Sequence, residues 1–390
     1  MNKTKKRILL AVSAMLIVCL SGCIGKAPIG NISESDSSYH HSSGGITPDT
    51  PSKLSNGDIE SIVSRMTDEE LVGQCFLVRC PKENAVADVS KYKLSGYILF
   101  GRDFQDSVTE RVCGAIAAYQ AASSIPLIIA VDEEGGTVNR VSLYSQYGKD
   151  PFRSAKDIFA EGGYDAIESD AVIKANFLKN LGINVNLAPV CDVSKKGSYM
   201  YPRSFGDDAS AVSEFVKRVV TGSEKSGVAA VLKHFPGYGD CENTHSGIAY
   251  DDRSIEQFRE CDFSPFKAGI AAGCGAVLVS HNIVRCMDAE LPASLSPAVH
   301  KVLREELGFD GVIMTDDIYM KAITEYTGGD AAYAAVAAIK AGNDLIISTE
   351  YQLQIHAVIR ALKEKELSRK ELEKSAVRIL KWKRNKGIIK

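Results

Sequence analysis

Short apolar runs rich in β-branched residues alternate along this chain with longer stretches of helical periodicity. Such strands, separated by helices, are typical of a parallel sheet that is covered on both faces. The predicted strands are residues 72–78, 96–100, 126–131, 183–190, 228–232, 276–279, 311–314 and 344–347. The predicted helices are residues 108–122, 166–181, 211–226, 254–272, 297–307, 331–341, 351–364 and 368–386. Eight strands in this alternation favour an α/β fold with a single closed (β/α)8 TIM-type barrel over an open doubly wound sheet.

The beginning of the chain has the pattern of an export signal. A basic start at residues 3–7 precedes an apolar core at residues 8–20, which is too short to span a bilayer comfortably. The core ends in Leu-Ser-Gly-Cys at residues 20–23, which resembles a bacterial lipobox and implies a lipidated Cys23. We therefore expect a lipoprotein signal peptide at residues 1–22 and a lipid anchor at Cys23 on the extracytoplasmic face of the cell membrane. A plain membrane-anchor helix is the alternative.

The composition after the signal separates a tether from a folded part. Residues 23–56 are rich in Ser, Gly and Pro and have few large apolar side chains, so we expect a flexible tether. Residues 57–390 are long enough for one barrel domain. The net charge of -3 gives no indication of nucleic-acid binding. No Cys-x-x-Cys pair is present, so a zinc site is not expected, and we expect few or no disulfides.

Polar side chains follow the apolar runs one after another. In a parallel barrel the ends of all strands lie on one rim, and barrel enzymes carry their active sites there. For any single residue, an ordinary loop position is the alternative interpretation. The residues concerned are Arg79, Arg102, Asp132, Asp192, Lys233, His281 and Asp316.

Residues 232–247 contain the greatest concentration of reactive groups. We expect a buried strand to end at Lys233 and His234, because the Pro-Gly-Tyr-Gly sequence at 236–239 cannot continue it. The loop that follows carries Asn243 and His245. An imidazole on a mobile loop can donate and accept protons near neutral pH, and Asn243 can orient it by hydrogen bonding. A surface loop with capping side chains is the alternative.

Two adjacent carboxylates, Asp316 and Asp317, follow the run at 311–314. A fixed, ionised carboxylate can act as a nucleophile toward the anomeric carbon of a sugar. Adjacent strand residues point to opposite sides, so we expect only one of the two to face the pocket. A metal pair is the rival interpretation, but neither a His-x-His motif nor an evenly spaced carboxylate cluster supports it.

Asp132, Arg140 and Arg203 can grip neighbouring hydroxyl groups of a sugar through charge-assisted hydrogen bonds. Asp132 begins a segment with two glycines that permit close approach of the backbone. Structural ion pairs are the alternative for each of these residues.

Five motifs together resemble glycoside hydrolase family 3. Within it they are most similar to the β-N-acetylhexosaminidases that release N-acetylglucosamine from peptidoglycan fragments. The motifs occur in the family's order between residues 66 and 347. They are Gly-Tyr-Ile-Leu-Phe-Gly-Arg (96–102), Asp-Glu-Glu-Gly-Gly-Thr-Val-Asn-Arg (132–140), Pro-Arg-Ser-Phe-Gly (202–206), Leu-Lys-His-Phe-Pro-Gly-Tyr-Gly (232–239) and Gly-Val-Ile-Met-Thr-Asp-Asp (311–317).

The resemblance implies a retaining exo-β-N-acetylglucosaminidase that acts on a carbohydrate substrate without a metal or other cofactor. Asp316 matches the family's nucleophile, and His245 matches the loop histidine that this subgroup uses as its general acid/base. The positions that match sugar-binding residues are Asp132, Arg140, Arg203, Lys233 and His234.

One position departs from the subgroup, which usually has Asp two residues before the catalytic histidine. Asn243 keeps a hydrogen bond but not the charge that stabilises an imidazolium, so we expect a weaker base and lower activity. The nearby acids Asp240 and Glu242 are possible substitutes. Two alternatives stay open at this stage: a β-glucosidase or β-xylosidase of the same family, and a sugar-binding lipoprotein with weakened catalysis.

Overall fold

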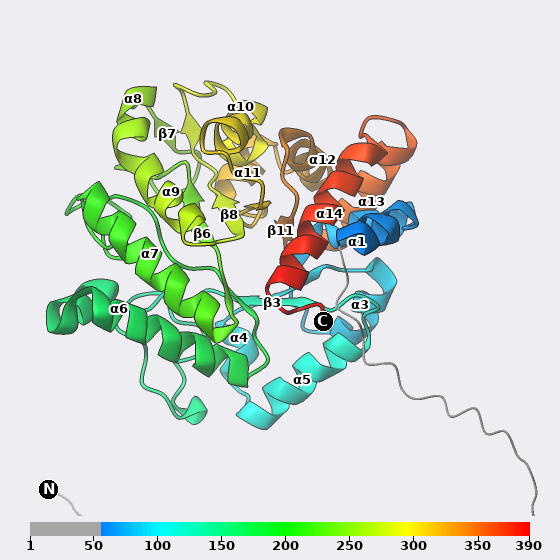
Figure 1. The fold of residues 1–390 in the computed structure, drawn as a ribbon. Helices are drawn as coiled ribbons and strands as arrows, with labels where there is room; N and C mark the ends of the chain where they lie inside the picture. The colour runs from blue at the N-terminus through cyan, green and yellow to red at the C-terminus, as the bar shows by residue number, and fades with distance from the viewer. Residues whose placement is uncertain (1–55) are drawn as a thin grey trace, which may run out of the picture. The chain divides into compact units, whose positions relative to one another are not determined.

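A computed structural model describes residues 56–390 of the protein (Figure 1). The predicted signal peptide, the lipidation site Cys23 and the predicted tether up to residue 55 lie outside the described residues.

Within the described part, nine strand segments form a parallel barrel. They are β1 (Phe76–Arg79), β2 (Gly96–Leu99), β3 (Ile128–Val131), β4 (Val185–Asn186), β5 (Ala229–Ala230), β6 (Leu232–Phe235), β8 (Ala276–Val279), β10 (Val312–Thr315) and β11 (Ile346–Ser348). Their order is β11-β1-β2-β3-β4-β5 in one run and β10-β8-β6 in another. Only Val231 separates β5 from β6, so these two are one strand, and a bridge from Met314 to Leu345 joins β10 to the start of β11. The ring of eight strands confirms the predicted TIM-type barrel.

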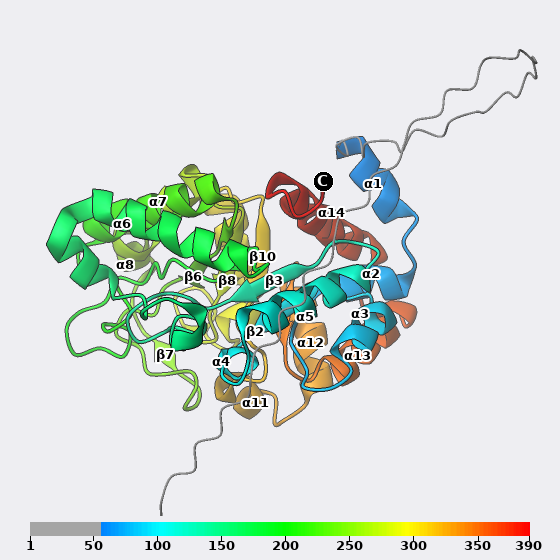
Figure 2. The ribbon, with the colours of Figure 1, turned by 90° about the horizontal axis from the view of Figure 1, so that it is seen from below.

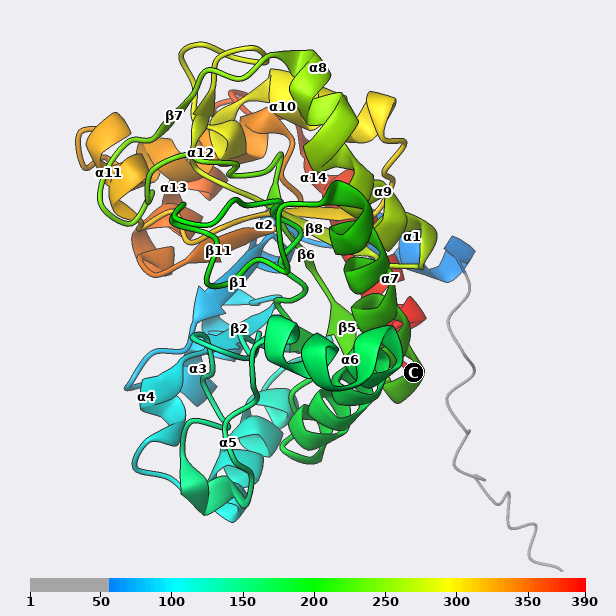
Figure 3. The ribbon, with the colours of Figure 1, turned by 90° about the vertical axis from the view of Figure 1, so that its left-hand side faces the viewer.

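Helices surround the strands, as Figures 1 and 3 show. All eight predicted helices are present, and the prediction for 331–341 matches the helix Ala331–Ala341 at both ends. The helix predicted at 166–181 begins earlier, at Ala155, and five further helices were not predicted: Asn56–Ser64, Asp68–Gln74, Ala85–Tyr92, Gly101–Phe104 and Lys321–Tyr326. The helices are α1 (Asn56–Ser64), α2 (Asp68–Gln74), α3 (Ala85–Tyr92), α4 (Gly101–Phe104), α5 (Thr109–Ala121), α6 (Ala155–Asn180), α7 (Ala209–Ser226), α8 (Ile255–Gln257), α9 (Phe263–Ala271), α10 (Pro297–Lys301), α11 (Lys321–Tyr326), α12 (Ala331–Ala341), α13 (Tyr351–Lys363) and α14 (Arg369–Asn385).

Short elements complete the connections. Two 3-10 turns, Ser145–Tyr147 and Ala293–Leu295, lie after β3 and β9, and two π-helical segments, Phe258–Asp262 and Val302–Glu306, continue α8 and α10. The small parallel pair β7 (Tyr250–Asp251) and β9 (Ile283–Val284) lies outside the barrel ladder.

Helices α1 and α14 close the N-terminal end of the barrel, where they lie next to each other (Figure 2). Ile59 of α1 and Ile379 of α14 belong to the same buried cluster as the side chains inside the barrel. The Nζ atom of Lys383 donates to the carbonyl oxygen of Ser95, one residue before β2 begins. Because this end is filled, a substrate site is left to the opposite end of the strands.

Two strand predictions are wrong in their bounds. Residues 72–74 belong to α2 rather than to a strand, because Thr67 and Glu70 form a capping box that starts a helix there. The predicted strand at 183–190 is reduced to β4, and beyond it only Val190 pairs again, in a single bridge with Lys233 after Pro189, which has no N–H to donate.

Three features are absent from residues 56–390: a metal-binding cluster, a disulfide and a helix able to cross a membrane. No group of three His, Cys, Asp or Glu side chains within 56–390 is arranged to hold a metal ion. The eight cysteines of this part are free thiols. Over the same residues, none of the helices has both the length and the apolar composition that crossing a membrane requires.

Candidate active site

A cavity of about 480 Å³ opens at the C-terminal end of the barrel strands. Its apolar floor comes from alternate strands of the barrel, and its walls carry most of the predicted site residues. This placement and this size are those of a barrel enzyme's substrate site. The floor residues are Ile98, Leu187, Leu278 and Ile347.

The structure brings seven of the eight predicted catalytic and binding residues to this cavity. The eighth, Asn243, does not line the cavity but contacts His245. Among the other polar residues at strand ends, Arg79 also lines the cavity, whereas Arg102, Asp192 and His281 do not. The seven lining residues are Asp132, Arg140, Arg203, Lys233, His234, His245 and Asp316.

One wall of the cavity consists of two cations and two anions, Asp132, Glu134, Arg203 and Lys233, which we call the charged wall. The Nζ atom of Lys233 lies 2.6 Å from Asp132 Oδ1 and 2.6 Å from Glu134 Oε1. Arg203 donates from Nε and Nη2 to the two carboxylate oxygens of Glu134, at 3.0 and 2.7 Å. Such fixed charges can form strong hydrogen bonds with the hydroxyl groups of a sugar.

Burial and charge act against each other within the charged wall. Burial alone would lower the pKa of Lys233, but Asp132 and Glu134 raise it above the usual value. Burial alone would raise the pKa of Glu134, but Lys233 and Arg203 hold it below the usual range. Lys233 and Glu134 are therefore ionised together, and each depends on charged partners to be buried in this form.

Glu134 was not singled out from the sequence, although it lies two residues after Asp132. In an extended segment, alternate residues face the same side, and this spacing would have identified it. Glu133, between them, faces away from the cavity. Its carboxylate accepts hydrogen bonds from the backbone N–H groups of Arg140, Val141 and Ser142, at 2.7, 2.8 and 3.0 Å, and so fixes the loop.

Replacement of Lys233 by methionine is expected to lower the free energy of unfolding by about 3–5 kcal/mol, because two buried carboxylates lose their shared cation. The matched control is Lys225→Met, which removes an exposed ion pair with Glu168 and is expected to change stability by about 1 kcal/mol or less. Urea denaturation of both variants checks this difference. Small and equal losses of stability in the two variants would show that Lys233 is not needed to neutralise Asp132 and Glu134.

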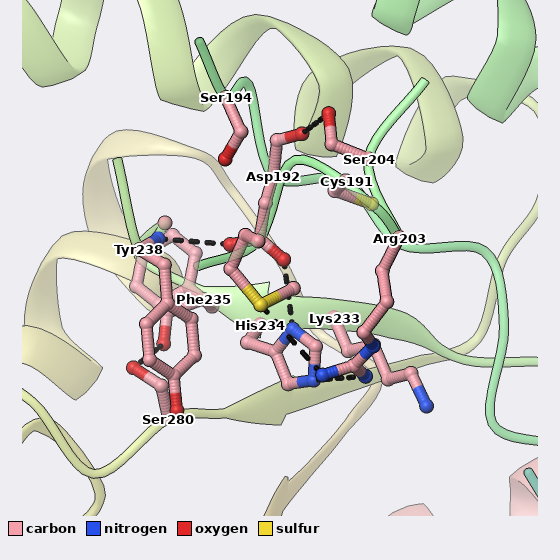
Figure 4. Close-up of polar contacts among 12 residues, drawn as sticks. Cys191, Asp192, Ser194, Arg203, Ser204, Lys233, His234, Phe235, Tyr238 and Ser280 are labelled. Carbon is pink, nitrogen blue, oxygen red and sulfur yellow. Dashed lines mark hydrogen bonds and ion pairs between the residues drawn. The ribbon is translucent and has the colours of Figure 1, made fainter. Parts of the chain in front are cut away.

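His234 lies between Asp192 and Arg203 (Figure 4). Its Nε2 is 3.2 Å from Arg203 Nη2, and its Nδ1 is 2.7 Å from Asp192 Oδ2. Because a guanidinium group can only donate, Nε2 accepts and Nδ1 carries the proton that is donated to Asp192. The fully buried Asp192 thus orients His234 from behind, a pairing across 42 residues that the sequence pattern did not reveal.

Asp316 follows directly after β10, and its backbone N–H still donates to Val279 of β8 at 3.1 Å. Its Oδ1 accepts the N–H of Asp317 at 2.8 Å. Burial acts to raise the pKa of Asp316, but His281, His234, this hydrogen bond and Lys233 together lower it below the usual value. The carboxylate is ionised at neutral pH, as a nucleophile requires.

The prediction that only one of Asp316 and Asp317 faces the pocket is wrong, because both line the cavity. The strand ends at Thr315, so the alternation of a strand does not continue through the two carboxylates. Asp317 accepts hydrogen bonds from the Thr349 hydroxyl at 2.6 Å and the Tyr319 N–H at 3.0 Å. Burial raises its pKa. These contacts give Asp317 the role of fixing the loop beside Asp316.

His245 lies on the loop after β6 and is oriented by Asn243, as the sequence predicted. Oδ1 of Asn243 accepts the backbone N–H of His245 at 2.9 Å and lies 3.0 Å from its Nδ1. An amide oxygen only accepts, so Nδ1 carries a proton and Nε2 is left for proton transfer. Loss of surrounding water lowers the pKa of this imidazole, and nearby Asp316 only partly opposes that effect. Neither Asp240 nor Glu242 forms a hydrogen bond with the ring in the described structure.

Arg79 and Arg140 each bring a buried Nε atom that has no hydrogen-bond partner within residues 56–390. Both side chains line the cavity, and the guanidinium of Arg79 lies 4.6 Å from the centre of the Phe100 ring. A buried donor without a partner is costly. We therefore expect oxygen atoms of the substrate to accept from these two side chains.

Comparisons with known proteins agree with this site. The family model described as "Glycosyl hydrolase family 3 N terminal domain" matches residues 66–382. A protein named Beta-hexosaminidase from Stenotrophomonas maltophilia (strain R551-3) is 35% identical over 274 residues, which are 68% of this chain and 80% of the relative. A Beta-hexosaminidase from Xanthomonas euvesicatoria pv. vesicatoria (strain 85-10) is 33% identical over 267 residues, with coverage of 65% and 76%.

Two solved structures have a similar fold. A glycoside hydrolase family 3 beta-N-acetylglucosaminidase from Paenibacillus sp. str. FPU-7 gives a TM-score of 0.76 at 30% identity, over 83% of this chain. This chain spans 63% of that protein's length. Beta-N-acetylhexosaminidase from Beutenbergia cavernae DSM 12333 gives a TM-score of 0.72 at 27% identity, with coverage of 82% of this chain and 98% of the other.

Proposed function

Because this chain belongs to glycoside hydrolase family 3 and is therefore a glycosidase, we propose that it is a retaining exo-β-N-acetylglucosaminidase. The observation that carries the proposal is the placement of Asp316 and His245 on one cavity, beside the charged wall. The names of the similar hexosaminidases and N-acetylglucosaminidases support N-acetylglucosamine as the sugar.

The proposed reaction begins with attack by the Asp316 carboxylate on the anomeric carbon. The bond from that carbon to the leaving oxygen breaks, while protonated His245 donates its Nε2 proton to this oxygen, and a glycosyl ester of Asp316 forms. Neutral His245 then accepts a proton from water, whose oxygen attacks the same carbon and displaces Asp316. Two inversions leave the product with the configuration of the substrate.

A panel of 4-nitrophenyl β-glycosides of N-acetylglucosamine, glucose and xylose tests the sugar specificity. The proposal predicts the highest kcat/KM for the N-acetylglucosaminide. A preference for glucose or xylose would favour the alternative glycosidases. Binding of N-acetylglucosamine without turnover of any glycoside would favour the sugar-binding alternative.

Replacement of Asn243 by aspartate is expected to raise turnover of 4-nitrophenyl N-acetyl-β-glucosaminide and to shift its pH dependence. Partial loss of surrounding water lowers the pKa of His245, so kcat/KM of the native enzyme should fall as pH rises through this lowered pKa, because the acid form is lost. A carboxylate 3 Å from Nδ1 favours the imidazolium, so the alkaline limb should move upward by about one pH unit or more. Unchanged turnover and an unchanged limb would show that Asn243 does not limit the enzyme.

We also propose that the enzyme is a lipoprotein held through Cys23 on the extracytoplasmic face of the cell membrane, where peptidoglycan fragments are its substrates. The order of basic start, apolar core and Leu-Ser-Gly-Cys supports this proposal. The native protein expressed in a bacterial host should enter the detergent phase on Triton X-114 partitioning, and Cys23→Ser should not. Equal partitioning of the native protein and Cys23→Ser would contradict the lipid anchor.

Release of N-acetylglucosamine from purified muropeptides tests the proposed natural substrate. A lack of N-acetylglucosamine release from muropeptides would contradict the proposed substrate.

A further inference from the structure

The loop that carries His245 is held in place by Thr244, the residue that precedes it. Thr244 is fully buried, whereas His245 is exposed. The Thr244 hydroxyl forms a hydrogen bond with the Tyr238 hydroxyl. The Thr244 carbonyl oxygen accepts the N–H of Ala322, in the first turn of α11, at 3.1 Å. Thr244 is thus fixed through both its side chain and its backbone, and its neighbour is the predicted acid/base.

Tyr238 is itself anchored to the sugar-binding side of the site. Only 2% of its surface is exposed, and its N–H donates to Asp192 Oδ1 at 2.8 Å. The other oxygen of Asp192 holds His234, and the rings of Tyr238 and His234 meet edge to face at 5.3 Å. A continuous set of contacts therefore leads from His234, through Asp192 and Tyr238, to Thr244 (Figure 4 shows the first three).

The turn beneath Tyr238 gives it a fixed base. Gly237 has φ +123°, a conformation that favours glycine, and a Cβ atom there would lie 2.2 Å from Asp262 Oδ1. The Gly237 carbonyl accepts from Arg253 Nη2 at 3.3 Å, and Arg253 also pairs with Asp262 at 2.7 Å. The backbone next to Tyr238 is therefore tightly packed, and the Tyr238 side chain has a fixed position from which it can hold the loop.

We propose that the Tyr238 hydroxyl is a positioning group that holds Thr244, and through it the His245 loop, in the orientation needed for proton transfer to the leaving group. Tyr238 acts through Thr244 and the backbone and is not itself a catalytic residue. The inference rests on the proposed function, because it assigns Tyr238 a part in the acid/base step. Burial raises the pKa of the Tyr238 phenol, which therefore keeps its proton for the bond to Thr244.

The test is Tyr238→Phe, which removes one hydroxyl group and keeps the buried ring. A misplaced acid should matter only when the leaving group needs a proton. We expect kcat/KM to fall by about 10- to 100-fold on a phenyl N-acetyl-β-glucosaminide and by less than about 3-fold on the 2,4-dinitrophenyl glycoside. Thr244→Val should reproduce this split, and Thr244→Ser, which keeps a hydroxyl group, should restore activity.

The matched control is Tyr97→Phe, which removes another buried hydroxyl, donated to the Ala85 carbonyl at 2.6 Å in the core behind β2. It should not separate the two substrates. Hydrogen exchange gives a readout independent of activity: amides of residues 240–247 should exchange faster in Tyr238→Phe and remain as in the native protein in Tyr97→Phe. Equal losses on both substrates, or unchanged exchange in the loop, would overturn the positioning role. If the native protein hydrolyses no N-acetylglucosaminide but the loop still exchanges faster in Tyr238→Phe, the proposed function is wrong. The role of Tyr238 in proton transfer then fails with it, although Tyr238 does hold the loop.

Discussion

Replacement of Asp316 by asparagine is expected to lower kcat/KM on aryl N-acetyl-β-glucosaminides by at least about 10⁴-fold, because the variant has no carboxylate to attack the anomeric carbon. The site around Asp316 favours an anion, since its neighbours lower its pKa in spite of burial. Asparagine keeps the shape of the side chain and an oxygen that can accept the N–H of Asp317. Steady-state kinetics with 4-nitrophenyl N-acetyl-β-glucosaminide measures the loss.

The control for Asp316→Asn is Asp317→Asn, at the neighbouring carboxylate on the same cavity. Asp317 is engaged by Thr349 and by the Tyr319 N–H, so its replacement should disturb the loop and reduce kcat/KM far less. Thermal unfolding of both variants separates folding from chemistry. Comparable losses in the two variants, or a larger loss in Asp317→Asn, would contradict the assignment of the nucleophile.

Replacement of His245 by glutamine should produce a loss that depends on the leaving group. General acid catalysis contributes about 10²- to 10⁴-fold, so we expect kcat/KM to fall by that amount on a phenyl glycoside. On the 2,4-dinitrophenyl glycoside, whose leaving group departs without a proton, kcat/KM should change little. The pH–rate profile of the variant should also lose the limb that His245 contributes.

The comparison variant for His245→Gln is His356→Gln, at a ring that packs against Tyr92 in the helical layer. His356→Gln should leave the ratio between the two substrates unchanged. A uniform loss on both substrates in His245→Gln would mean that the imidazole binds the sugar or shapes the loop instead of donating a proton.

The sequence pattern predicted the barrel because its strands are buried on both faces and appear as short, continuous apolar runs. The helices between them show the helical spacing of apolar residues instead. The errors of this prediction lie where a local signal competes with the apolar pattern. The capping box at Thr67 and Glu70 extends a helix into an apolar run that reads as a strand. The end of β10 at Thr315 removes the alternation on which the orientation of Asp316 and Asp317 was predicted.

Asp132 and Asp316 could be predicted because each follows a strand end, which the barrel collects on one rim, and Lys233 and His234 because they lie near the end of β6. Their partners could not, because the pairs form through space between distant segments. Lys233 meets Asp132 across 101 residues, and Arg203 meets Glu134 across 69. No periodicity within either segment records such a pairing. The contact between Asn243 and His245 was predictable, since it spans only two residues.

In the proposed reaction Asp316 becomes covalently attached to the sugar. Incubation with a 5-fluoro-N-acetylglucosaminyl fluoride, followed by mass spectrometry of the intact protein and its peptides, detects this covalent intermediate. We expect a mass increase of one fluorinated glycosyl group, located on the peptide that contains Asp316 and absent from Asp316→Asn. Attachment to another residue, or turnover of the reagent without any covalent adduct, would show that Asp316 is not the nucleophile.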